Sequence, residues 1–100
     1  VQIELLHSKR FIILKGYIFK DEDNIIVTGK VRRRSNAFGI SGHVDIEILD
    51  TEGNITEKQS IPHYPRIVRR RGGEDASFST VLKSIVAKNS VVRIAYHEQH

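Results

Sequence analysis

The apolar side chains of this 100-residue chain are mostly branched at the β-carbon. It contains 14 isoleucines and 9 valines against 5 leucines and 4 alanines, and 4 threonines bring the β-branched total to 27. Such side chains pack well on the pleated surface of a strand, and they lose rotamer freedom in a helix. We therefore predict an all-β fold. The length is enough for one modest core, so we expect a single domain over residues 1–100.

Runs of β-forming residues alternate with turn signals along the chain. In GHVDIEILD, residues 42–50, apolar and polar side chains alternate, which is the pattern of a half-buried strand. The acidic tetrad at 21–24 joins two β-rich runs and predicts a hairpin, because Asp and Asn favour tight turns. Pro62 and Pro65 interrupt the run at 55–64, since proline has no N–H to give to a ladder, and they predict a sheet edge or a crossover.

The expected strands cover 1–6, 11–20, 25–34, 42–50, 55–64, 76–82 and 91–98, with a loop at 35–42. Seven short antiparallel strands in a chain of this length predict an immunoglobulin-like β-sandwich. An open β-barrel is the structural alternative.

Composition excludes several kinds of site. Without cysteine the chain has no disulfide, no reactive thiolate and no cysteine-based zinc site. No apolar run approaches the roughly 18 residues that a membrane-spanning helix needs. The chain begins with Val1 and contains no Met, and we expect that an export leader has been removed.

Three segments resemble the FxLYD-like sandwich domains of bacterial envelope proteins: VTGKVRRRSN, VDIEILDTEGNI and GEDASFSTVL. The resemblance covers roughly residues 25–97. The chain departs from the pattern where Ile48-Leu49-Asp50 lacks an aromatic residue and where arginines replace a short polar loop. The resemblance implies a sandwich fold, a periplasmic or cell-envelope location, and a binding or spacing role without catalytic residues to transfer. Function drawn from it is an analogy, because one fold hosts many functions.

Positive charge is concentrated in two short runs. Of the 16 lysines and arginines, four lie in 30–34 and four in 66–71, and the net charge is +4 with a pI near 9.6. Arginine binds phosphate and carboxylate in a two-point manner, and a basic face attracts anionic partners over long range. The predicted partner-binding residues are Arg32, Arg33, Arg34, His63, Tyr64, Arg66, Arg69, Arg70 and Arg71.

Two other interpretations of these runs stay open. The arginines can be a solvated surface or an edge guard against strand pairing, with Glu74 and Asp75 as local ion-pair partners. Alternatively, Tyr64 and Phe38 stack on the bases of a nucleic acid whose phosphates the arginines contact. The sequence does not show whether the two runs share a face.

The histidines and acidic residues give a weaker signal. The five histidines are His7, His43, His63, His97 and His100, and weak metal binding would require at least three of them to converge. The spacing of His97 and His100 suits loose copper or nickel binding, but surface histidines without a ligand set are commoner. We therefore expect no metal and no cofactor.

Catalysis has little support in the sequence. Asp45 and Glu47 share a face of one strand with no base or nucleophile beside them, so they are most simply polar surface. There is no Gly-x-Ser-x-Gly elbow and no phosphate-binding loop. We expect no enzyme but an interaction or spacer module of a bacterial envelope protein, with an arginine-rich surface for an acidic protein or an anionic glycolipid. Nucleic-acid binding is the alternative function, and metal binding by histidines is a further one.

Overall fold

The computed structural model describes residues 2–8, 11–33, 41–64, 75–83 and 86–99. In these residues the chain forms seven strands in two sheets, which confirms the predicted all-β sandwich. The strands are β1 (Gln2–Leu6), β2 (Phe11–Asp21), β3 (Asn24–Arg33), β4 (Ser41–Leu49), β5 (Ile55–Ile61), β6 (Ala76–Leu82) and β7 (Val91–Gln99). The described ranges contain no helix that is long and apolar enough to cross a membrane.

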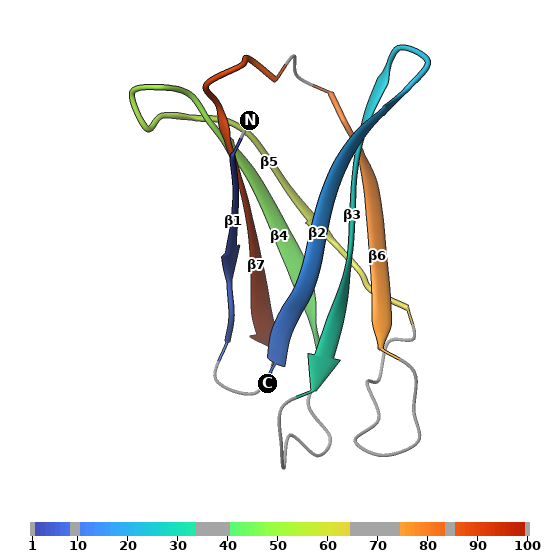
Figure 1. The fold of residues 1–100 in the computed structure, drawn as a ribbon. Coiled ribbons are helices and arrows are strands. Elements are labelled where there is room, and N and C mark those ends of the chain that lie inside the picture. The colour runs from blue at the N-terminus through green and yellow to red at the C-terminus, as the bar shows by residue number, and fades with distance from the viewer. Residues whose placement is uncertain (1, 9–10, 34–40, 65–74, 84–85, 100) are drawn as a thin grey trace.

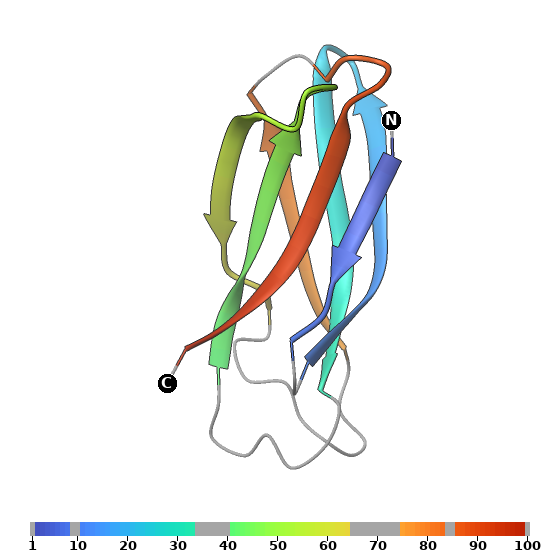
Figure 2. The same cartoon turned by 90° about the vertical axis from the view of Figure 1, so that its left-hand side faces the viewer.

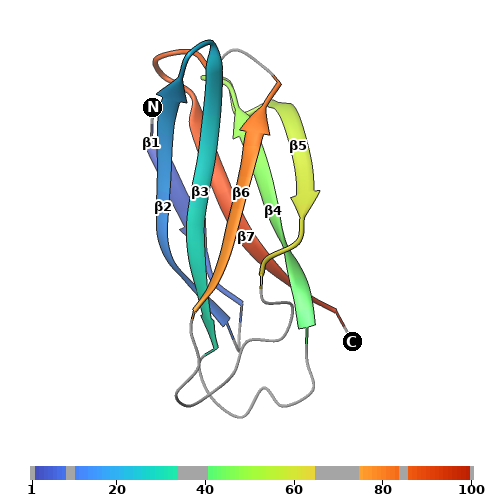
Figure 3. The same cartoon turned by 90° about the vertical axis from the view of Figure 1, so that its right-hand side faces the viewer.

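The two sheets lie face to face as layers (Figure 1). One sheet has four strands in the order β1-β7-β4-β5 (Figure 2), and the other has three in the order β2-β3-β6 (Figure 3). β1 pairs with β7 in parallel, and the other pairs are antiparallel. Immunoglobulin constant domains order their strands ABED and CFG, so this chain shares their sandwich architecture with a different strand order.

The core is built from the inward-facing side chains of both sheets. The predicted alternation is confirmed on β4, where Val44, Ile46 and Ile48 are buried, and on β7, where Tyr96 is buried. The core residues are Phe11, Ile13, Val27, Val31, Val44, Ile46, Ile48, Ala76, Phe78, Leu82, Val92, Ile94 and Tyr96. Because each strand alternates, every second side chain of these strands lies on an outer face.

A β-bulge determines which side chains of β2 face outward. Ile13 pairs with Val31 and Lys15 pairs with Lys30, so Leu14 is an extra residue in the ladder. The extra residue shifts the alternation by one position. Ile13 before the bulge and Ile18 after it therefore both pack on the core, and the side chains of 15, 17 and 19 face outward.

The predicted interruption at Pro62 is a crossover between the sheets. β5 ends at Ile61 in the four-stranded sheet, and Tyr64 then forms an isolated antiparallel bridge with Ser77 of the three-stranded sheet. The two backbone hydrogen bonds of this bridge measure 2.8 and 2.7 Å. Side chains of β5 complete the junction, because Gln59 Nε2 donates to the Val81 carbonyl at 3.0 Å.

Candidate functional site

The predicted arginine strip at the end of β3 is divided between two sides of the strand. Arg32 is exposed on the outer face, and Arg33 is half-buried on the opposite side, because consecutive residues of a strand point in opposite directions. Arg32 forms a two-point ion pair with Asp75, at 3.0 Å from Nε and 3.2 Å from Nη2. The hydrogen bond and the charge of Asp75 raise the pKa of Arg32 above its ordinary value. Asp75 is one of the two acids considered as local partners, and the other, Glu74, lies outside the described residues.

His63 corrects the prediction that it belongs to the basic contact surface. Its side chain is fully buried, and its Nε2 lies 2.8 Å from the hydroxyl of Tyr96. Burial excludes the His63 ring from contact with a surface ligand in this fold. Tyr64, the next residue, is 63% exposed and remains a candidate. The two consecutive side chains thus have opposite environments.

The rest of the predicted strip lies outside the described residues. These positions are Arg34, Arg66, Arg69, Arg70 and Arg71, together with Phe38 and His100. The described residues therefore do not show whether the two arginine runs share a face.

The outer face of the three-stranded sheet carries exposed apolar side chains that sequence reasoning missed. Tyr17, Phe19 and Val81 are 53%, 47% and 46% exposed. Phe19 pairs with Ile26, which in turn pairs with Val81. Phe19, Ile26 and Val81 therefore form one apolar row across β2, β3 and β6. Figure 3 has this sheet in front. The alternation in YIFK, residues 17–20, places Tyr17 and Phe19 on the same side of the strand. Whether that side faces outward depends on the bulge.

A row of basic side chains lies on the same face, two rows away. Lys15 and Lys30 are both exposed and directly opposite each other in the β2–β3 ladder. Like charges at opposed positions destabilise a sheet, by about 0.2–1 kcal/mol. The lysine pair is therefore not explained by stability, and it makes this end of the face positive, whereas the charge of Arg32 is paired with Asp75.

A hollow lies at the β6 edge of the same sheet, beside Tyr64. Its volume is about 450 Å³, and it is lined by Thr28, Ile61, Pro62, Tyr64, Ser77, Phe78 and Ser79. We call the lysine row, the apolar row and the Tyr64 hollow together the lysine–aromatic face. The lining offers hydroxyls and two aromatic rings, so the hollow can accept a side chain of a partner that covers the face.

The outer face of the four-stranded sheet is different, because its charged groups are paired. Arg93 lies between Glu4 of β1 and Glu47 of β4, at 3.6 and 3.8 Å. Asp45 accepts a hydrogen bond of 2.6 Å from the hydroxyl of Ser60 on β5. This outcome agrees with the expectation that Asp45 and Glu47 belong to a polar surface.

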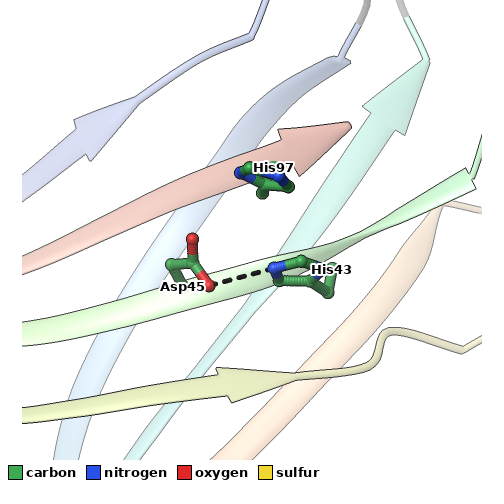
Figure 4. Close-up of side chains that lie close together, drawn as sticks. All are labelled: His43, Asp45 and His97. Carbon is green, nitrogen blue, oxygen red and sulfur yellow. Dashed lines mark ion pairs between the residues drawn. The ribbon is translucent and has the colours of Figure 1, made fainter. Parts of the chain in front are cut away.

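Two of the five histidines converge with Asp45 at one end of this second face. His43 and His97 are register partners on β4 and β7, and their rings are stacked with centroids 4.8 Å apart. His43 Nε2 lies 3.2 Å from Asp45 Oδ1. One ligand atom from each of the three residues lies within 4.8 Å of the others. Figure 4 shows the three side chains close together. A metal site was predicted only if three histidines converged, and here a carboxylate takes the third place.

The two outer faces thus contain the candidate sites in the described part of the chain. No known protein family, no curated protein and no solved structure matches this sequence. The functional inferences below depend on the residues of these two faces.

Proposed function

We propose that this chain is a non-enzymatic interaction module that binds an acidic protein segment through its lysine–aromatic face. One observation carries the proposal: exposed Tyr17 and Phe19 lie on the same face as the opposed pair Lys15 and Lys30. Contact of aromatic side chains with water is unfavourable, and opposed lysines repel each other. An acidic partner with apolar side chains would relieve both costs at once.

The arrangement of the face favours a protein over a nucleic acid. Its apolar side chains gather in one row and its basic side chains in another, so the two kinds are separated rather than interleaved. Protein interfaces have an aromatic-rich centre with a charged rim. Proteins that bind single-stranded nucleic acid instead combine stacking aromatic rings with a basic groove along the backbone.

Nucleic-acid binding is the second candidate because of one feature of β2. Tyr17 and Phe19 are two residues apart on the same face, and such a pair offers stacking surfaces for two successive bases. The location in the bacterial cell envelope, and with it an anionic glycolipid as partner, stays a prediction that depends on the resemblance described above.

A titration followed by amide NMR spectra tests the proposal. The ¹⁵N-labelled chain is titrated separately with a peptide that alternates glutamate and leucine, with oligothymidylate, and with bicelles that contain an anionic glycolipid. We expect the acidic peptide to shift the signals of Tyr17, Phe19, Lys30 and Val81. The affinity should fall as salt increases, because the lysine contacts are screened.

Matched variants test whether binding requires the apolar side chains of this face or any exposed apolar side chain. Tyr17→Ser with Phe19→Ser should lower the affinity at least tenfold. Ile55→Ser should leave it unchanged, because Ile55 is 53% exposed but begins β5 of the other sheet. Equal losses in the two proteins, or shifts confined to other surfaces, would disprove the proposal. A response to oligothymidylate alone would select the second candidate.

A further inference from the structure

We propose that His43, Asp45 and His97 bind a divalent transition metal of the Zn²⁺ class on the outer face of the four-stranded sheet. The three side chains project from the neighbouring strands β4 and β7 (Figure 4). Imidazole nitrogen and carboxylate oxygen are the ligands that Zn²⁺ takes in proteins without thiolates. This site is separate from the lysine–aromatic face, because it lies on the other sheet.

The distance between two of the ligand atoms already suits a tetrahedral ion. Bonds of about 2.0–2.2 Å to nitrogen and oxygen place neighbouring ligand atoms roughly 3.3–3.5 Å apart. His43 Nε2 and Asp45 Oδ1 are 3.2 Å apart, which is close to that separation. Both side chains are half-buried, so the sheet restricts their movement.

His97 has to move by a small amount to complete the site. Its ring is stacked on His43 with an interplanar angle of 21°. The ligand atoms lie up to 4.8 Å apart. The separation in a tetrahedral site is reached when the His97 nitrogen moves by roughly 1.5 Å. His97 is exposed, and a rotation about its side-chain bonds supplies that movement.

The surroundings favour a metal over an ordinary polar cluster. Ser60 donates a 2.6 Å hydrogen bond to Asp45 Oδ1, which orients the carboxylate in the way that outer-shell groups orient metal ligands. Ala95, which pairs with Asp45 across the ladder, carries only a methyl group, so no longer side chain projects there from β7.

Three protein ligands leave one tetrahedral position for water. Such an open site on an exposed strand pair is less closed than a structural zinc site with four protein ligands. We therefore expect saturable binding of one ion per chain, with no requirement of the metal for folding.

Isothermal titration with ZnCl₂ on the tag-free, chelator-treated chain tests the proposal. We expect one ion per chain, and no binding of MgCl₂ under the same conditions. His43→Gln and Asp45→Asn should each lower the Zn²⁺ affinity at least tenfold. Glu47→Gln is the control, because Glu47 lies on the same face of β4 but contacts Arg93, and its variant should bind as the unchanged chain does.

Long-range ¹H–¹⁵N spectra of the imidazoles identify the ligands directly. Zn²⁺ should shift the ring nitrogens of His43 and His97 while those of His63 stay in place, since His63 is buried elsewhere. His100→Gln separates this site from loose binding by the last histidines, and it should keep the affinity. An unchanged affinity in His43→Gln, or the absence of saturable Zn²⁺ binding, would overturn the proposal.

Discussion

On the four-stranded sheet, charged side chains of neighbouring strands meet partners of opposite sign, whereas on the three-stranded sheet Lys15 and Lys30 face each other. Arg93 lies between two glutamates, at 3.6 and 3.8 Å. The second face adds the exposed rings of Tyr17 and Phe19. Similar alternating strands therefore produce one outer face on which opposite charges meet and one on which two lysines oppose each other beside exposed rings. Exposed apolar side chains of the second kind are the better indication of a binding partner.

The largest expected effect comes from a substitution at Gly29 of β3, the central strand of the sheet that carries the lysine–aromatic face. A Cβ at Gly29 would overlap the backbone carbonyl of Lys15 and lie 2.5 Å from Cζ of Phe78. Because backbone and a buried ring must both shift, Gly29→Ala should lower the free energy of unfolding by about 3 kcal/mol. Urea unfolding followed by circular dichroism measures this change.

Gly16, the register partner of Gly29, provides the control. A Cβ there would meet Cδ1 of Ile94 at 2.8 Å, and this atom is the flexible end of a side chain. Gly16→Ala should therefore cost less, about 1 kcal/mol. Equal losses would show that the backbone contact at Gly29 has no special weight.

The next effect concerns Tyr96, on the inner side of the strand that carries Arg93. Burial, with a smaller contribution from the charge of Glu98, raises the pKa of Tyr96 from 10 to about 12. Since the pKa is higher in the folded chain, the associated stability is complete below pH 10 and is lost as the pH rises through 12. The loss amounts to about 2–3 kcal/mol.

Tyr96→Phe removes this ionisation. Its free energy of unfolding at pH 7 should fall by about 1 kcal/mol, because the contact with His63 is lost. Its further decrease between pH 10 and 12 should be smaller than that of the unchanged chain. Parallel decreases in urea unfolding at these pH values would contradict the assignment to Tyr96.

The smallest expected effects come from removing one charge on each outer face. Arg93→Gln removes attraction to two carboxylates and should lower the free energy of unfolding by about 1 kcal/mol at low salt. Lys30→Gln removes repulsion from Lys15 and should raise it by about 0.3 kcal/mol. Thermal unfolding at low and high salt measures both, and the two differences should shrink as salt increases. Changes of the same sign would remove the distinction between the faces.

The sequence predicts the fold well because alternation is a local property. Inward-facing residues such as Val44 and Ile46 were identified from period two alone, and Pro62 marked the crossover correctly. The faces of β2 were not predictable, because the bulge at Leu14 reverses the alternation without a signal in composition.

The candidate sites depend on contacts between distant segments, and the sequence predicts these poorly. His43 and His97 meet only because β4 pairs with β7 in one register, and a shift by one residue would put them on opposite faces. Of the predicted arginine site, the described residues retain Arg32 and Tyr64 as exposed groups. His63 was misplaced because it lies between two prolines just before the basic run, whereas its ring is buried in space.

The parallel pairing of β1 with β7 has a mechanical consequence. Gln2 pairs with Val91, and β7 continues from there to Gln99, so the start of β1 and the end of β7 lie at opposite ends of the sandwich. A force that pulls these two ends apart acts along the strands and across their hydrogen bonds. It loads the whole β1–β7 ladder in shear, so that the bonds must break together rather than one after another. A domain with this pairing resists stretching far better than one whose terminal strands can be peeled apart from one end.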